Sequence, residues 1–183
     1  MTEKLDQILA FNREFVASGE YKKYLSTKFP YKKLAILSCM DTRLTALLPA
    51  ALNLKNGDVK IIKNAGGMIS HPYGSVMRSL MVAIYELGVE EILVIGHYDC
   101  GMQGKDSGGI IAKMLQRGIE PQTLEIIRAC GIDLDAWLSG FGDVETSVRQ
   151  SVELIKGHPL MPRDIEVRGL IIHPESGELT VVV

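Results

Sequence analysis

The segment "KLAILSCMDTR" (residues 33–43) joins a short apolar run to three reactive polar groups. Its first part, "KLAILSC" (33–39), is almost continuously apolar, which is typical of a strand buried on both faces of a parallel sheet. Cys39, Asp41 and Arg43 then occupy alternate positions where that strand ends. The segment therefore predicts a buried strand with a thiol, a carboxylate and a guanidinium at its carboxyl end.

Working outward from this segment, apolar runs alternate with segments of helical periodicity. The predicted strands are 33–39, 59–65, 91–97 and 166–173, and the predicted helices are 46–54, 74–88, 109–118 and 142–158. This alternation indicates an α/β fold with a mostly parallel sheet of about four strands, flanked by helices. The turn-rich "HPESG" before "GELTVVV" (177–183) predicts a hairpin that adds an edge strand.

Two kinds of signal mark the ends of elements and of the domain. Gly88 and Gly157 stand where the carboxyl end of a helix favours a left-handed residue. Residues 2–17 carry apolar side chains at helical spacing, which predicts an amphipathic helix that packs on a partner subunit. We expect one domain over 1–183, with an N-terminal helical arm (1–30) and an α/β core (31–183).

Composition excludes several classes of function. The 183 residues include 20 basic and 22 acidic side chains, a formal net charge of −2, with no basic block. Neither a nucleic-acid partner nor binding to an anionic membrane is therefore expected. No run of 18 apolar residues predicts a membrane span, and the charged N-terminal segment lacks an apolar export core. We expect a cytoplasmic protein.

The three cysteines, Cys39, Cys100 and Cys130, are too few and too scattered for a disulfide framework. Cys130 lies in the helix-like "EIIRACG", and we interpret it as a small buried hydrophobic residue. Cys100 belongs to "HYDC" (97–100), where His97 and Cys100 are three residues apart. Because parallel strands end at the same edge of a sheet, His97 should meet Cys39 there.

Cys39, His97 and Cys100 form the mixed thiolate and imidazole set that zinc prefers. Three protein ligands leave a fourth position, which Asp41 or a water molecule can take. Arg43 is suited to hold the Asp41 carboxylate away from the metal with two parallel hydrogen bonds. Two alternatives stay open, namely a non-catalytic zinc protein with Asp41 as fourth ligand and an enzyme that uses Cys39 as a nucleophile.

At these residues the chain resembles the β-class carbonic anhydrases. That family carries C-x-D-x-R after its first strand and H-x-x-C after its third, as "CMDTR" and "HYDC" do here, and "KNAGG" (63–67) matches its asparagine-alanine-glycine loop. The resemblance implies that Cys39, His97 and Cys100 bind zinc and that Asp41 and Arg43 form the catalytic pair. It also implies a homodimer or a higher assembly whose N-terminal helix reaches the neighbour.

The reaction implied by the resemblance is reversible hydration of carbon dioxide to bicarbonate by zinc-bound hydroxide. Members of the same fold also hydrolyse carbon disulfide, which is the alternative substrate. Gly66 and Gly67 could offer backbone N–H groups to bicarbonate, or could simply permit a tight turn. His71 is a candidate proton shuttle or a surface residue, and Asp99 either orients a ligand or caps the following turn.

Overall fold

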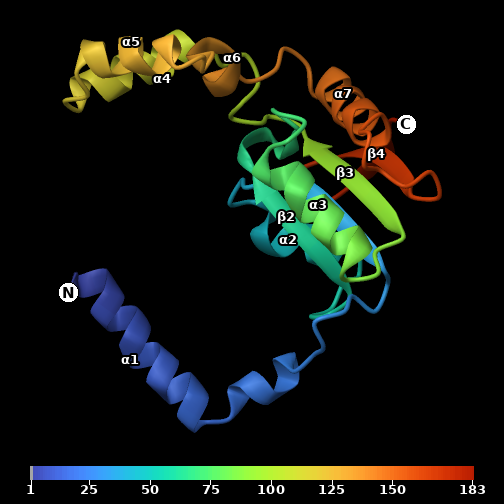
Figure 1. Cartoon of the computed structure of the whole chain (residues 1–183). Coiled ribbons are helices and arrows are strands. Elements are labelled where there is room, and N and C mark those ends of the chain that lie inside the picture. The colour runs from blue at the N-terminus through green and yellow to red at the C-terminus, as the bar shows by residue number, and fades with distance from the viewer. Residues whose placement is uncertain (1) are drawn as a thin grey trace.

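The computed structural model describes residues 2–183 and contains a five-stranded sheet in the order β2-β1-β3-β4-β5 (Figure 1). The strands are β1 (Leu34–Cys39), β2 (Val59–Asn64), β3 (Glu91–His97), β4 (Glu166–Ile172) and β5 (Leu179–Val181). β1 to β4 pair in parallel, and β5 pairs antiparallel with β4 at the edge. The predicted α/β class, the parallel strands and the terminal edge strand are confirmed.

Helices connect the strands at nearly the predicted positions. They are α1 (Glu3–Ala17), η1 (Glu20–Tyr24), α2 (Leu44–Ala51), η2 (Ala65–Gly67), α3 (Ser75–Tyr85), α4 (Ser107–Gln116), α5 (Pro121–Ala129), α6 (Leu134–Leu138) and α7 (Val144–Lys156). Each of the four predicted internal helices is present, shifted by a few residues. The prediction did not include α6, and it noted only part of α5 as helix-like. Among residues 2–183, no helix has the length and apolarity needed to cross a membrane.

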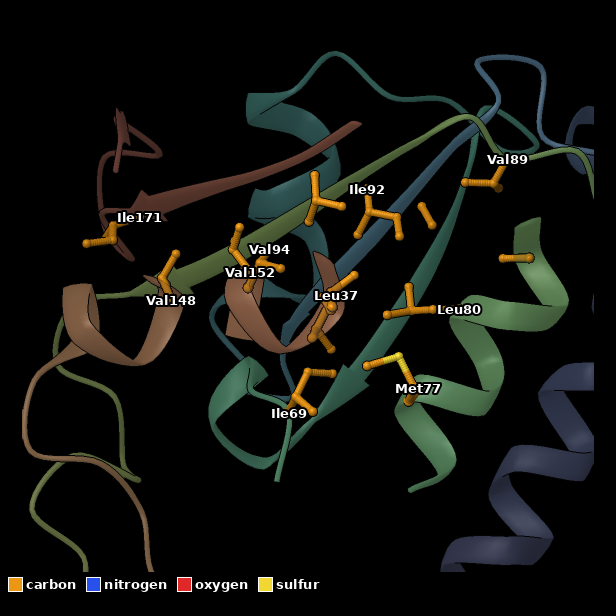
Figure 2. Packing of buried hydrophobic residues seen from close by; sticks show 14 of the residues in the cluster. Leu37, Ile69, Met77, Leu80, Val89, Ile92, Val94, Val148, Val152 and Ile171 are labelled. Carbon is orange, nitrogen blue, oxygen red and sulfur yellow. The ribbon is translucent and has the colours of Figure 1, made fainter. Parts of the chain in front are cut away.

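Helices cover both faces of the sheet, which explains why its central strands β1 and β3 are largely apolar. On one face, Met77 and Leu80 of α3 and Val152 of α7 pack against the side chains of β1 and β3 (Figure 2). On the other face, Leu44 and Leu48 of α2 pack with a second buried cluster. Residues 34–37 of β1 alternate between these two clusters, so both faces of that segment are apolar.

The lobe made of α4, α5 and α6 lies beyond the carboxyl ends of the strands, and α1 leads away from the sheet (Figure 1). None of the residues Glu3–Ala17 is buried within the chain. Apolar side chains such as Ile8 and Phe11 are exposed on α1, with Ile8 at 64%. The predicted amphipathic helix is therefore present, and its apolar face is uncovered in the single chain.

One of the two predicted left-handed helix ends is wrong. Gly88, three residues after α3, has a φ of 71° and is left-handed as expected. Gly157 has a φ of −80°, in the right-handed helical region, and its N–H still donates to the carbonyl of Glu153. The helical conformation continues through Gly157 because the chain turns only at His158, where the following Pro159 disfavours further helix.

Gly169 in β4 allows α7 to pack directly on the sheet. A Cβ atom at this position would lie 2.6 Å from Val148 and 2.9 Å from Val183. Both neighbours are β-branched and have few alternative rotamers, so they cannot easily make room. We therefore expect Gly169→Ala to lower the free energy of unfolding by about 1–3 kcal/mol, measured by urea denaturation.

Gly109 in α4 is the matched control, because no atom lies within 4 Å of a Cβ built there. Gly109→Ala should be neutral or should stabilise the protein by about 0.5–1 kcal/mol through helix propensity. Equal urea midpoints for the two variants would contradict this account of the packing between α7 and β4.

Candidate metal centre

Cys39, His97 and Cys100 meet at the carboxyl end of the sheet, as the sequence predicted. Cys39 is the last residue of β1, and His97 is the last residue of the neighbouring strand β3. Parallel pairing in the register Ser38↔Ile95 places the two strand ends side by side. Cys100 follows in the turn after β3, so all three side chains reach the same point without a long connection.

The three side chains are buried and close enough to bind one metal ion. Their ligand atoms lie within 4.8 Å of one another, and the two sulfur atoms are 3.8 Å apart. His97 is fully buried, and its Nδ1 bonds to the carbonyl oxygen of Tyr98 at 2.9 Å. Its Nε2 is buried and has no hydrogen-bond partner among the described residues. A buried polar atom without a partner is costly, and a cation held by Nε2 and the two sulfurs removes that cost.

Contact between the two thiols separates their acidities. Hydrogen bonding with Cys100 lowers the pKa of Cys39; burial opposes this effect, and the nearby His97 and the backbone of Asp41 and Gly66 reinforce it. The same contact, followed by burial, raises the pKa of Cys100. Once one thiol has ionised, its negative charge therefore hinders ionisation of the other. A divalent cation between the sulfurs would allow both to be thiolates, the form that binds zinc.

Arg43 holds the Asp41 carboxylate in the bidentate arrangement that the sequence predicted. Its Nε donates to Oδ1 of Asp41 at 3.1 Å, and its Nη2 donates to Oδ2 at 2.9 Å. The backbone N–H of Arg43 adds a bond of 2.9 Å to Oδ1. These bonds, chiefly those from the Arg43 side chain, lower the pKa of Asp41 to about 2, so the carboxyl group is ionised at neutral pH.

The carboxylate of Asp41 lies beside the candidate metal ligands without joining them. Its Oδ2 is 3.9 Å from Nε2 of His97. Burial lowers the pKa of His97, but contacts with Cys39, the Tyr98 carbonyl and Asp41 together outweigh it, so the pKa is raised. Asp41 thus lies next to the candidate metal ligands while Arg43 holds its carboxylate.

Asp99 makes a contact that the sequence interpretation missed. We expected it to orient a ligand or to cap a turn, but its carboxylate and its carbonyl both accept hydrogen bonds from Arg43. The spacing within each motif does not predict this contact, because Arg43 follows β1 and Asp99 follows β3. A left-handed φ of 52° at Asp99 turns the residue toward the guanidinium.

The two glycines after β2 have distinct surroundings. Gly67 has a φ of 61°, and a Cβ atom there would lie 2.7 Å from the backbone nitrogen of Cys39. This supports the interpretation of Gly67 as a residue that permits a tight turn against β1. Gly66, with a φ of 85°, contributes a backbone N–H near the Cys39 sulfur. A substrate-binding role for Gly66 and Gly67 stays a prediction.

Two neighbouring cavities lie at this end of the sheet. One, of about 350 Å³, is lined by Cys39, Asp41, Gly66 and Cys100 and gives access to the candidate metal ligands. The other, of about 370 Å³, includes His71 and Trp137 and shares Ala65 and Met102 with the first. His71 is exposed, and its Nδ1 accepts the backbone N–H of Tyr73 at 3.0 Å, so its role as a proton shuttle stays a prediction.

The interpretation of Cys130 as a buried hydrophobic residue is wrong. Cys130 is exposed at the carboxyl end of α5, in the lobe that extends beyond the sheet. Because α5 turns only part of its surface toward neighbouring residues, its apolar sequence alone did not indicate which side chains are covered.

Comparison with known proteins places the chain in a family. The sequence pattern of the carbonic anhydrase family matches residues 34–179. A Bacillus subtilis (strain 168) protein, YvdA, whose own assignment as a carbonic anhydrase is provisional, is 54% identical over 98% of this chain and 91% of its own. The crystal structure of β-carbonic anhydrase isoform I from Trichomonas vaginalis superimposes with a TM-score of 0.90 at 35% identity, covering 100% of this chain and 98% of that one.

The protein therefore belongs to the carbonic anhydrase family, and its fold is that of the β-class. The similar proteins do not all share one activity. A carbon disulfide hydrolase from Acidithiobacillus thiooxidans is 29% identical over 81% of this chain and 76% of its own. Membership of the family thus leaves the substrate to be decided by the site itself.

Metal analysis tests the ligand set directly. We expect the purified protein to hold about one zinc ion per chain and Cys100→Ser to lose most of it, because two remaining ligands bind zinc weakly. Inductively coupled plasma mass spectrometry after gel filtration gives the metal-to-protein ratio. Cys130→Ser is the matched control, since it removes an exposed thiol far from the site. Equal zinc content in both variants would contradict the assignment of Cys100.

Proposed function

We propose that this protein catalyses the zinc-dependent, reversible hydration of carbon dioxide to bicarbonate. The observation that carries the proposal is the ionised Asp41 carboxylate, clamped by Arg43 beside three buried residues suited to zinc. If Asp41 completed the metal coordination, the site would suit a structural role. Because Arg43 holds Asp41, the fourth position on the metal would be free for the reacting water molecule.

Cys39, His97 and Cys100 would hold the metal, and His97 would bind through Nε2, since its Nδ1 is bonded to the Tyr98 carbonyl. When bound, zinc supplies Lewis acidity that brings the pKa of a water molecule toward neutrality. The bond from the Tyr98 carbonyl orients the imidazole ring.

Asp41 would orient the attacking water by accepting a hydrogen bond at Oδ2, the oxygen nearest to His97. Because the pKa of Asp41 is about 2, the carboxylate stays an acceptor and does not take up the proton of the water near neutral pH. Ala65 and Met102 supply apolar wall to the cavity, which suits a small apolar substrate. Backbone N–H groups of Gly66 and Gly67 are our candidates for contacts with bicarbonate.

Carbon disulfide hydrolysis is a second candidate, because it is the activity named for a relative that shares 29% identity with this chain. The two substrates are both linear molecules with an electrophilic central carbon, so the same residues could serve either. Carbon dioxide is favoured by the higher identity to a protein provisionally assigned as a carbonic anhydrase.

We further propose a homodimer or a higher assembly in which α1 packs on a neighbouring copy. The exposed apolar face of α1 supports this, since no residue of Glu3–Ala17 is buried within the chain. A helix with such a face is seldom stable without a partner surface. Cytoplasmic location and the lack of a nucleic-acid or membrane partner stay predictions.

Stopped-flow hydration with a pH indicator tests the proposed activity. The zinc-replete protein should hydrate carbon dioxide at pH 8 and above. Arg43→Ala should lower kcat/KM on the order of 100-fold with zinc retained, because a released Asp41 can occupy the metal's fourth position. Hydrogen sulfide release from carbon disulfide, measured on the same preparation, separates the two candidate substrates.

Arg163→Ala is the matched control, since it removes an exposed arginine outside the site. A fully zinc-loaded wild-type protein that is inactive toward carbon dioxide would overturn the proposed reaction. Loss of zinc from Arg43→Ala would instead contradict the role given to Arg43, because that side chain is assigned to Asp41 and not to the metal.

The proposed assembly is tested by sedimentation velocity on the 20.1 kDa chain. The wild type should sediment as a dimer or larger, and Ile8→Asp should weaken association by about tenfold or more, since it places a charge on the apolar face that the proposed assembly would bury. Gln7→Asp places the same charge on the polar face of α1 and should leave association unchanged. A monomeric wild type at micromolar concentration would be inconsistent with the proposed assembly.

A further inference from the structure

The guanidinium of Arg43 is shared between two carboxylates from different parts of the sheet. Toward Asp41 it uses Nε and Nη2. Toward Asp99 it uses Nη1, which donates to Oδ2 at 2.8 Å, and Nη2, which donates to the backbone carbonyl at 2.8 Å. Asp99 lies between two candidate metal ligands, so Arg43 links the Asp41 end of β1 to the turn that carries Cys100.

Stability alone does not account for this contact. The Asp99 side chain is 85% exposed, and an exposed ion pair contributes little to folding. Geometry is a better explanation, because a guanidinium donates only in its own plane. Bonds to Asp99 from Nη1 and Nη2 set the orientation of that plane, and the plane decides whether Nε and Nη2 meet both oxygens of Asp41.

We propose that Asp99 is a positioning residue that acts through Arg43 to keep Asp41 off the metal. This inference rests on the proposed function of the site and extends it to a third charged group. Without Asp99, Arg43 keeps its charge but loses the contacts that fix its plane, so Asp41 is released for part of the time. The fraction of sites with Asp41 on the metal then rises, and fewer sites are open to a ligand.

Two substitutions of Asp99 distinguish the effect of its carboxylate from the effect of its backbone conformation. Glycine adopts the left-handed φ of Asp99 without strain, so Asp99→Gly keeps the turn and the carbonyl bond to Arg43 but removes the carboxylate. In Asp99→Asn, asparagine also tolerates the left-handed conformation. Its side-chain oxygen can still accept a hydrogen bond from Nη1 of Arg43, but it carries no charge. Asp164→Asn is the control, since it removes an exposed carboxylate before β4.

The experiment measures the binding of sodium azide to the cobalt-substituted protein, and the visible absorption of the cobalt reports how much azide is bound. Azide needs the fourth position, so a competing Asp41 raises its apparent Kd whether or not the protein hydrates carbon dioxide. We expect the apparent Kd to rise about tenfold in Asp99→Gly and about two- to threefold in Asp99→Asn, as a charge-assisted bond is lost or weakened. The kcat for hydration should fall in the same order with KM unchanged.

Each other outcome overturns the inference. Wild-type azide affinity in Asp99→Gly would mean that Asp41 alone positions Arg43, and loss of cobalt would mean that Asp99 shapes the ligand turn. If Asp99→Gly does not fold, Asp99→Asn decides, and affinity equal to that of Asp164→Asn contradicts the proposal. A wild-type protein that binds no cobalt would overturn the proposed metal site as well, which distinguishes that failure from one seen only in the variants.

Discussion

Parallel pairing of β1 with β3 is the constraint on which the rest of the site depends. The two strands are distant in sequence, yet their register brings Cys39 and His97 to adjacent strand ends. Both strands are covered on each face by apolar clusters, and the close packing of these side chains holds the strands in place. The hydrophobic packing of the sheet therefore also positions the chemistry at its carboxyl edge.

Without a cation, the two thiols and the imidazole at this edge of the sheet are electrostatically unfavourable neighbours. Two thiols in contact compete for ionisation, and the buried Nε2 of His97 has no partner among residues 2–183. The only nearby carboxylate that faces these ligands, Asp41, is already paired with Arg43 among the described residues. A divalent metal would satisfy the thiolates and the imidazole together. The fold thus brings three candidate metal ligands together and pairs the nearest carboxylate with Arg43.

Sequence reasoning predicted the strands and the three candidate ligands because each depends on local pattern. A buried strand must be apolar at nearly every position, and "CMDTR" and "HYDC" place their reactive groups at its end. The sequence-based prediction was wrong for residues whose exposure or conformation depends on packing between segments. Cys130 looked like a core residue, yet α5 leaves it exposed. Gly157 looked like a left-handed stop, yet the helix continues through it and the chain turns at the following residues.

By itself, the sequence determined the α/β class, the order of the parallel strands along the chain, and the choice of Cys39, His97 and Cys100 as candidate metal ligands. It also determined that Arg43 could hold Asp41, because two residues of spacing suffice for that pair. Only the tertiary structure decided that Asp99 joins Arg43, since that contact spans 56 positions. Contacts between distant residues arise from sheet register and backbone conformation, and neither is encoded in a short motif.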